Sequence, residues 1–216
     1  MLKYLVYFFL IISNILASSS LDKKHNFLYE DITFLSNSNT NNPIPRHASY
    51  FKSNKKNAVI LVHQSGYSKE SWYFFSKILK DNNLSSLALE NISVDDILGA
   101  INFLKENGYK DISLMGASLG GASILRMMNS YSNIDISKII LLAPSIGPAL
   151  QNKVEKLIIV STKDFYSDKA YETYNEASEP KILREYSGTA HAQKLFDTNH
   201  KENLITIILN FLKHSN

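Results

Sequence analysis

The chain has 216 residues, of which 44% are hydrophobic and 20% charged, values typical of a single globular domain with a sizeable core. Its net charge of +3 is too small, and its lysines too scattered, to indicate a nucleic-acid-binding protein. The absence of cysteine excludes disulfide bonds, thiolate metal sites and a cysteine nucleophile.

The first twenty residues have the layout of a secretory signal peptide. Lys3 supplies a positive charge, an apolar stretch follows at 4–16 with one polar break, and small residues occupy 17–20. The apolar stretch is shorter than the roughly 20 residues that a membrane-spanning helix needs. We therefore expect residues 1–20 to direct export, to the periplasm or out of the cell. An uncleaved N-terminal membrane anchor is the alternative, and it would associate the protein with a membrane.

Residues 21–216 are expected to form one domain in which strands alternate with helices. Before residue 57 the chain is polar, with two candidate edge strands at 32–35 and 47–51 on either side of an asparagine-rich loop. Beyond it, β-rich apolar runs alternate with segments of helical spacing. The predicted strands lie at 58–62, 85–89, 111–115, 138–143, 157–161 and 181–186, and the predicted helices at 69–80, 94–106, 121–129, 167–177 and 202–212.

This alternation predicts an α/β fold, with a mostly parallel, doubly wound sheet and helices on both of its faces. The segment between the strands at 138–143 and 157–161 is too short for a cap domain. We therefore expect a site at the end of the sheet that no additional domain covers.

The most informative motif is Gly116-Ala117-Ser118-Leu119-Gly120, which directly follows the predicted strand at 111–115 and opens into the predicted helix at 121–129. The pattern G-x-S-x-G in this context is typical of a nucleophile elbow, which exposes the serine hydroxyl over the end of a sheet. Glycine is needed on both sides of the serine because the turn brings backbone close to it. A glycine-rich turn in which Ser118 merely caps the helix is the alternative interpretation.

A serine hydroxyl becomes a nucleophile at neutral pH when a base lies next to it and an acid orients that base. His191 is the best candidate base, since it lies in a small-residue loop just after the last predicted strand. Asp164 is the best candidate acid because it follows the strand at 157–161 at the same edge. Asp168 is the alternative, although it better fits the first turn of the next helix. The predicted catalytic triad is Ser118, Asp164 and His191, in the chain order usual for this arrangement.

An oxyanion hole needs two donors directed at the developing negative charge. We predict the Leu119 N–H, directly after the nucleophile, as the first donor. The second is predicted in the loop after the strand at 58–62, where the Ser65 N–H is the first choice and Gln64 the second. His63 lies in the same loop but precedes the serine in the chain, so we interpret it as a residue that shapes the loop.

Five short segments carry a family resemblance: Val62-His63-Gln64-Ser65-Gly66, Ser71-Trp72, Gly116 to Gly121, Ser161 to Asp164, and Gly188 to His191. Together they resemble the α/β-hydrolase superfamily, and above all its small, lidless members of the dienelactone hydrolase and carboxylesterase type. The resemblance covers roughly 57–214. It implies the α/β-hydrolase fold, with the same triad and no metal or organic cofactor.

The chain departs from this family at three places. Gln64 stands where the oxyanion loop usually has glycine, and Glu90 stands where many relatives have aspartate. Ser118 stands where dienelactone hydrolases often have cysteine, which favours ester substrates. Residues that could line a substrate pocket are Tyr67, Trp72, Ile146 and Phe165.

The predicted activity is that of a serine hydrolase that cleaves small carboxylic esters through an acyl-enzyme intermediate. We expect a preference for short acyl chains, because an uncapped site is open and shallow. A thioester or amide hydrolase, or an acyltransferase, could use the same triad. An exported, non-catalytic binding protein with a hydrolase fold is the alternative from another class. The expected partner is a small-molecule ester and not a nucleic acid, and the oligomeric state stays open.

Overall fold

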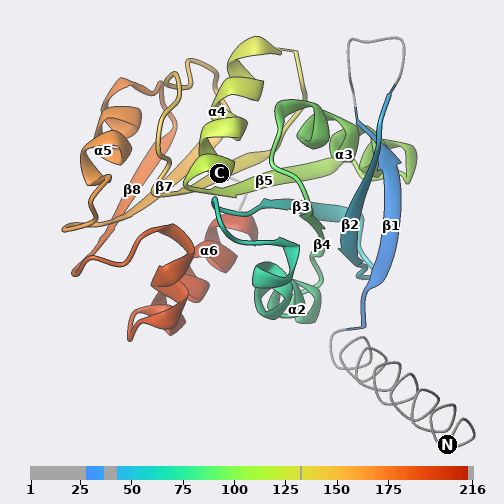
Figure 1. The fold of residues 1–216 in the computed structure, drawn as a ribbon, viewed down its shortest axis with the longest axis horizontal. Helices are drawn as coiled ribbons and strands as arrows, with labels where there is room; N and C mark the ends of the chain where they lie inside the picture. Colours follow the sequence, from blue (N-terminus) through green and yellow to red (C-terminus); the bar gives the residue numbers. More distant parts are fainter. Residues whose placement is uncertain (1–27, 37–42, 132, 214–216) are drawn as a thin grey trace, which may run out of the picture.

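The computed structural model describes residues 28–36, 43–131 and 133–213 (Figure 1). The predicted signal peptide at 1–20 therefore lies outside the described residues. The strands are β1 Glu30–Leu35, β2 Pro45–Phe51, β3 Asn57–Val62, β4 Ser85–Leu89, β5 Asp111–Ala117, β6 Lys138–Leu142, β7 Glu155–Ser161 and β8 Lys181–Tyr186. The helices are α2 Tyr73–Asp81, α3 Val94–Glu106, α4 Leu119–Ser130, α5 Ser167–Glu176 and α6 Lys201–Lys213, with 3-10 helices η1 Lys69–Trp72 and η2 Ala192–Asp197.

The strands of the described chain form one sheet in the order β1-β2-β4-β3-β5-β6-β7-β8. Strand β2 is antiparallel to both of its neighbours, whereas the pairs from β4 to β8 are all parallel. The predicted mostly parallel α/β sheet is confirmed, and so is the placement of the first two strands at one edge. Parallel strands all end at the same edge of the sheet, which is where the predicted site residues follow β5, β7 and β8.

Helices cover both faces of the sheet, as predicted. Helices α3, α4 and α5 lie on one face, and α2 and α6 lie on the other (Figure 1). Strand β3 shows why its sequence is a continuous apolar run. Ala58, Ile60 and Val62 contact the first helical layer, while Val59 and Leu61 contact the second. Successive side chains of a strand point to opposite faces, so a strand buried on both faces is apolar throughout.

Ser93 caps α3, whose start at Val94 agrees with the predicted helix at 94–106. The Asp96 N–H donates to Ser93 Oγ, and the Ser93 N–H donates in return to Asp96 Oδ2, which completes a capping box. Arg46 of β2 donates to Asp96 Oδ1 at 2.6 Å. The start of α3 is therefore joined to the antiparallel part of the sheet as well as capped.

The helix predicted at 69–80 is present in two pieces, the 3-10 turn η1 and then α2. The reason lies at Ser71, whose N–H and hydroxyl both donate to the Ser68 carbonyl oxygen, at 3.1 and 2.6 Å. A bond that spans three residues gives the tighter 3-10 geometry. The closing helix is slightly longer than predicted, and η2 precedes it.

No helix or strand interrupts 143–154, between β6 and β7, so this segment holds no cap domain. In the described part of the chain, no helix is both long and apolar enough to cross a membrane.

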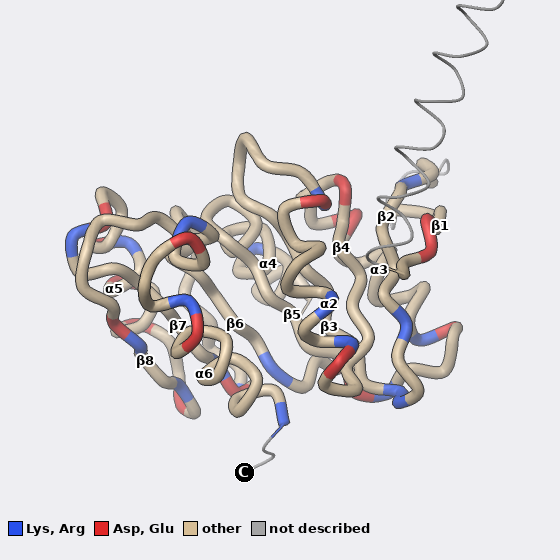
Figure 2. Tube along the Cα trace, turned by 90° about the horizontal axis from the view of Figure 1, so that it is seen from below, with Lys and Arg blue, Asp and Glu red and all other residues tan. Residues whose placement is uncertain are grey.

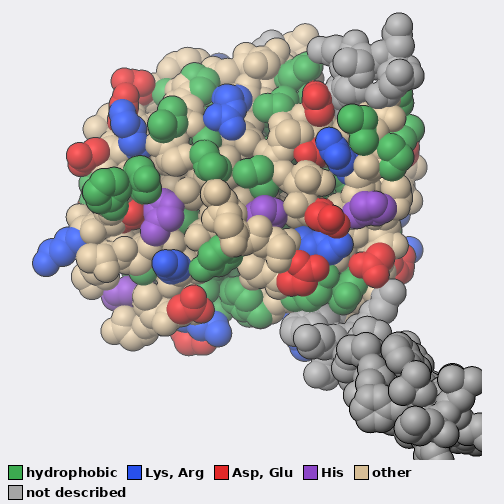
Figure 3. Space-filling view, in the orientation of Figure 1, with side chains coloured by type: hydrophobic (Ala, Val, Ile, Leu, Met, Phe, Trp, Pro, Cys, Tyr) green, Lys and Arg blue, Asp and Glu red, His purple; other side chains and the backbone are tan. Residues whose placement is uncertain are grey.

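Lysine and arginine are interspersed with aspartate and glutamate along the trace (Figure 2). On the face seen in Figure 3, the apolar side chains lie in small groups among polar atoms.

Candidate active site

Ser118 lies in the turn between β5 and α4 and has an unusual backbone conformation, with φ 49° and ψ −114°. A positive φ is uncommon for a residue other than glycine and persists only where neighbouring structure holds it. Here the Ser118 N–H donates to the Leu142 carbonyl of β6 at 2.9 Å, and the Ser118 carbonyl accepts the Ala122 N–H of α4 at 2.9 Å. The neighbouring strand β6 and the helix α4 therefore fix the serine in this strained conformation.

The glycines around Ser118 are required by close backbone contacts, as the motif predicts. A Cβ atom on Gly116 would lie 2.7 Å from the Gly121 nitrogen, so the two arms of the turn could not meet. Gly120 lies directly against the carbonyl groups at the end of β3. These contacts produce the tight elbow and bring the start of α4 next to the loop after β3.

The structure brings His191 between Ser118 and Asp164. His191 Nε2 lies 2.8 Å from Ser118 Oγ, and Nδ1 lies 2.8 Å from Asp164 Oδ2 and 3.0 Å from Oδ1. An ionised carboxylate can only accept hydrogen bonds, so Nδ1 carries the proton. Nε2 is then free to accept the hydrogen bond of the Ser118 hydroxyl. A general base for the serine would need these two ring contacts.

Asp164 is positioned by the turn after β7 and is only 4% exposed. Its Oδ1 also accepts the Tyr166 N–H at 3.0 Å, which fixes the carboxylate plane. Its own N–H donates to the Ser161 carbonyl at 3.0 Å. Asp168 instead lies exposed in the first turn of α5. Of the two acids considered from the sequence, the structure places Asp164 against His191.

The loop that carries His191 is fastened to the turn that carries Asp164. The Ser161 hydroxyl donates to the Ala190 carbonyl at 2.6 Å, and the Lys163 N–H donates to the Gly188 carbonyl at 2.9 Å. Gly188 has φ +115°, a conformation that favours glycine. Since β7 and β8 are paired neighbours, these bonds continue their ladder into the site.

No protein-family model and no curated protein sequence matches the chain. Solved structures do match it. An alpha/beta hydrolase from Penicillium has a TM-score of 0.71 and 14% identity, over 86% of this chain and 98% of that one. An esterase from Pyrococcus furiosus has a TM-score of 0.71 and 15% identity, over 88% and 94%. A dienelactone hydrolase from Anabaena variabilis has a TM-score of 0.69 and 15% identity, over 86% and 98%.

The chain has the α/β-hydrolase fold. The fold that the sequence resemblance implies is therefore confirmed. In this α/β-hydrolase fold, Ser118 follows β5, Asp164 follows β7 and His191 follows β8, and all three meet at the carboxyl edge of the parallel strands.

The two predicted oxyanion donors lie at either side of the contact between α4 and β3. Leu119 is the first residue of α4, so its N–H belongs to the turn whose donors have no partner within the helix. In the loop after β3, the Gln64 N–H already donates to Gln193 Oε1 at 2.9 Å. Of the two choices in that loop, Ser65 is left as the prediction for the second donor.

His63 is buried, and its ring lies between two backbone carbonyls. Nδ1 is 2.8 Å from the Gln64 oxygen, and Nε2 is 3.1 Å from the Glu90 oxygen. Within the described chain, these ring contacts join the loop after β3 to the end of β4 and not to the triad. They agree with the interpretation of His63 as a residue that shapes the loop.

Four large exposed apolar side chains lie within two residues along the chain of Ser118, of Asp164 or of Ser145, whose N–H donates to the Ser118 carbonyl. We call them the apolar rim: Leu119, Ile146, Phe165 and Tyr166. Leu119 follows the nucleophile, and Phe165 and Tyr166 follow the triad acid. The Tyr166 ring lies 5.4 Å from the His191 ring, between centroids. Phe165 is 90% exposed.

Trp72, in contrast, is fully buried in the core against Phe75 and Phe196, and the expectation that it lines the pocket is not supported.

An open cavity of about 590 Å³ lies beside the His191 loop, and it is lined mainly by polar residues. Tyr67, another residue considered from the sequence, lines it, and so do Ala190 and Lys194. The loop after β3 and the loop that carries His191 therefore both face this cavity.

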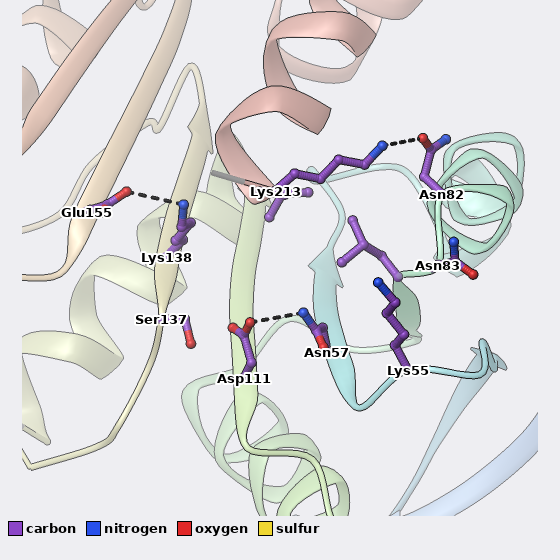
Figure 4. Close-up of a pocket in the computed structure, with 11 residues that line it drawn as sticks. Lys55, Asn57, Asn82, Asn83, Asp111, Ser137, Lys138, Glu155 and Lys213 are labelled. Carbon is purple, nitrogen blue, oxygen red and sulfur yellow. Dashed lines mark hydrogen bonds and ion pairs between the residues drawn. The ribbon is translucent and has the colours of Figure 1, made fainter. Parts of the chain in front are cut away.

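A second polar cavity, of about 570 Å³, lies at the opposite edge of the α/β-hydrolase sheet, where the parallel strands begin (Figure 4). Lys138 and Glu155 form an ion pair there at 3.3 Å, and Asn57 donates to Asp111 at 3.1 Å. No triad residue lines this cavity, so it is separate from the candidate active site.

Two contacts of the site were not predicted from the sequence. Gln193 contacts the loop after β3, and the Tyr166 ring lies beside the His191 ring. Gln193 lies two residues after His191, and that proximity is the only sequence signal for it.

In the described ranges, no three His, Asp or Glu side chains are grouped in a way that could hold a metal ion.

Proposed function

We propose that the chain is a serine hydrolase that cleaves small carboxylic esters through a covalent acyl-enzyme intermediate. The observation that carries this proposal is the 2.8 Å hydrogen bond from Ser118 Oγ to His191 Nε2, with Asp164 on the other ring nitrogen. Nucleophile, base and orienting acid are the parts that acyl transfer by serine requires. Among the solved structures that share the fold are an esterase and a dienelactone hydrolase, which supports an ester as the substrate.

In the proposed reaction, His191 takes the proton of Ser118 as the hydroxyl oxygen attacks the ester carbonyl. Asp164 holds the ring in place and stabilises its cationic form. The N–H groups of Leu119 and Ser65 stabilise the negative charge on the carbonyl oxygen. His191 then donates its proton to the departing alcohol. Water cleaves the acyl-enzyme by the same route and frees Ser118. These steps need no metal or organic cofactor.

The surroundings of Ser118 support a substrate with a small apolar acyl group. The apolar rim offers exposed hydrocarbon on the segments that carry or contact Ser118 and Asp164, where it could cover an acyl chain. No cap domain lies between β6 and β7 to enclose a long chain. We therefore propose that short acyl groups are preferred over long ones.

Hydrolysis of p-nitrophenyl acetate, butyrate and a long-chain ester by the wild-type chain and by Ser118→Ala tests this function. Ser187→Ala is the matched control, because Ser187 is exposed in the His191 loop and lies outside the triad. The proposal predicts turnover of the short esters by wild type and control, and none above background by Ser118→Ala.

Two other outcomes separate the alternatives. If the wild type is inert towards esters but a fluorophosphonate labels Ser118, the same triad acts on a thioester or amide or transfers an acyl group. If the chain is inert and unlabelled, the non-catalytic binding protein is favoured.

We also propose that residues 1–20 direct export, with the periplasm or the extracellular space as the destination. Mass measurement of the mature chain from its native host tests this. Loss of about twenty residues supports a cleaved signal peptide. A full-length chain in the membrane fraction supports the N-terminal anchor instead.

A further inference from the structure

Gln64 and Gln193 form a reciprocal pair of hydrogen bonds, which we call the glutamine clasp. The Gln64 N–H donates to Gln193 Oε1 at 2.9 Å, and the Gln193 N–H donates to Gln64 Oε1 at 3.0 Å. Each side-chain carbonyl therefore accepts the backbone N–H of the other residue. Because backbone groups take part on both sides, the clasp fixes the two chain segments and not only the side chains.

The clasp is buried, with Gln64 6% and Gln193 5% exposed. The remaining Gln193 amide group, Nε2, donates to Ser71 Oγ at 2.9 Å, and the Ser71 hydroxyl donates to the Ser68 carbonyl. Buried polar groups are costly to leave unpaired, and networks that pair them are rigid. These bonds therefore hold both glutamine side chains in one orientation.

The clasp joins two loops that the sheet itself does not connect. Gln64 lies in the loop after β3, next to Ser65, and Gln193 lies in η2, two residues after His191. In the sheet, β5, β6 and β7 separate β3 from β8. No strand ladder therefore sets the position of one loop against the other. Below the sheet, α2 and α6, which follow these loops, lie on the same face (Figure 1).

We infer that Gln64 and Gln193 are positioning residues: the clasp holds the Ser65 N–H at a fixed place relative to His191 Nε2 and so forms the second half of the oxyanion hole. The inference rests on the proposed function. It also gives a role to Gln64, which stands where the resembled family usually has glycine, because a glycine could not supply the Oε1 acceptor. Neither glutamine touches the substrate in this account.

The test compares Gln193→Met with Gln151→Met on p-nitrophenyl acetate. Methionine keeps the length of the side chain and removes its amide. Gln151 is a matched control, since it is exposed and its amide also makes two hydrogen bonds, to Glu176 O and from Ser178 Oγ, both 2.8 Å. We expect Gln193→Met to lower kcat by about 10- to 100-fold, somewhat less than direct loss of an oxyanion donor. KM should change by less than about threefold, because the loss falls mainly on the transition state, and the control should match the wild type.

A second readout separates positioning from general destabilisation. In the matching thionoester, sulfur replaces the carbonyl oxygen and accepts hydrogen bonds weakly, so an intact oxyanion hole favours the oxygen ester. Loss of the Ser65 donor should lower the ratio of kcat/KM for ester over thionoester. A variant that is merely less folded lowers both rates together and leaves their ratio unchanged.

Two further variants keep the test informative if Gln193→Met does not fold. Gln64→Met leaves the Gln64 N–H bonded to Gln193 and should lower kcat less than Gln193→Met. Gln193→Glu keeps an oxygen acceptor and should retain more activity than the methionine variant. Gln193→Met still leaves the backbone N–H of residue 193 bonded to Gln64 Oε1, and the double methionine variant removes that bond as well. The double variant should therefore lose at least as much kcat as Gln193→Met, but less than the product of the two single losses if the clasp acts as one unit.

The possible failures are distinct. If Ser118-dependent turnover and the ester-to-thionoester ratio stay at wild-type values in folded Gln193→Met and Gln64→Met, the clasp inference is overturned and the proposed function stands. If the wild type and Ser118→Ala are equally inert and Ser118 is not labelled, the proposed function and the clasp inference are both overturned.

Discussion

A Cβ atom placed on Gly120 would lie 2.5 Å from the carbonyl oxygen of Val62. Only glycine lets the first turn of α4 pack this closely against the end of β3. The contact holds the Leu119 N–H, which precedes Gly120, beside the loop that carries Ser65. The second glycine of the elbow motif thus serves the proposed oxyanion hole as well as the nucleophile.

Gly120→Ala should therefore lower both stability and kcat, because α4 must shift away from β3 to admit the methyl group. Gly99→Ala is the control: its Cβ would lie 2.3 Å from the Leu35 carbonyl, an equally severe contact remote from the triad. Urea unfolding and ester turnover per active site separate the two effects. We expect the free energy of unfolding to fall in both variants and kcat to fall only in Gly120→Ala. Equal kcat in the two would contradict this account of α4.

Asp164→Asn should reduce kcat by about 10³- to 10⁴-fold, because an amide cannot hold the Nδ1–H tautomer of His191 or stabilise its cation. Asp168→Asn removes the same charge from an exposed position in the next helix and should leave kcat within about twofold. Ester hydrolysis with matched amounts of folded protein measures both. A larger loss in Asp168→Asn would mean that the turn after β7 rearranges in solution.

Phe165→Ser tests whether the apolar rim contacts the acyl chain. Phe165 is highly exposed, so its loss should leave the free energy of unfolding almost unchanged. It should lower kcat/KM for butyrate relative to acetate by about threefold, since each methylene covered is worth up to about 0.8 kcal/mol. Leu35→Ser, at an exposed apolar residue of β1, should change neither. An unchanged butyrate-to-acetate ratio in Phe165→Ser would remove the rim from the acyl site.

Lys156 of β7 is a buried cation, 1% exposed. Within the described residues, the hydrogen bonds of its ammonium group all go to backbone carbonyls. Its Nζ donates to Asn152, Val154 and Ser178 at 2.6, 2.7 and 3.1 Å. Lys156→Met would remove these three hydrogen bonds and should lower the free energy of unfolding by about 1–3 kcal/mol. Exposed Lys55→Met is the control.

Burial lowers the pKa of Lys156 below the ordinary lysine value, because it removes the ammonium from water; Lys181 adds to the effect, and Glu179 opposes it. At pH values between the pKa of Lys156 in the folded chain and its higher pKa in the unfolded chain, the unfolded chain binds more protons. The contribution of Lys156 to the free energy of unfolding therefore increases as the pH rises through this range. The stability difference between wild type and Lys156→Met should therefore grow with pH on the alkaline side. Urea titrations at neutral and alkaline pH measure it. A difference that shrinks would contradict the direction of the pKa shift.

The fold, and the three residues that the structure brings together as the candidate triad, could be predicted because their signals are local. A continuous apolar run marks β3, and the G-x-S-x-G pattern marks the elbow at Ser118. Asp164 and His191 follow from chain order and from their places just beyond strands. The choice between Asp164 and Asp168 also followed from position, since the latter lies within the first turn of α5.

The parts that escaped prediction depend on contacts between distant segments. Gln64 and Gln193 are far apart in the chain, and neither has a neighbour pattern that marks its partner. Trp72 looked like a candidate pocket wall because aromatic residues serve both cores and pockets. Its burial against Phe75 and Phe196 is decided by how α2 and η2 pack, which no local pattern reveals.

Acyl transfer by Ser118 is measured most directly by the intact mass of the chain quenched in acid shortly after mixing with p-nitrophenyl acetate. We expect a transient gain of one acetyl group, located on Ser118 by peptide mapping, that decays as acetate is released. Ser118→Ala should show no such gain, and Asp164→Asn should form it far more slowly. Turnover of the ester without any acetylated chain, or acetylation at another residue in wild type, would contradict the proposed Ser118 acyl-enzyme.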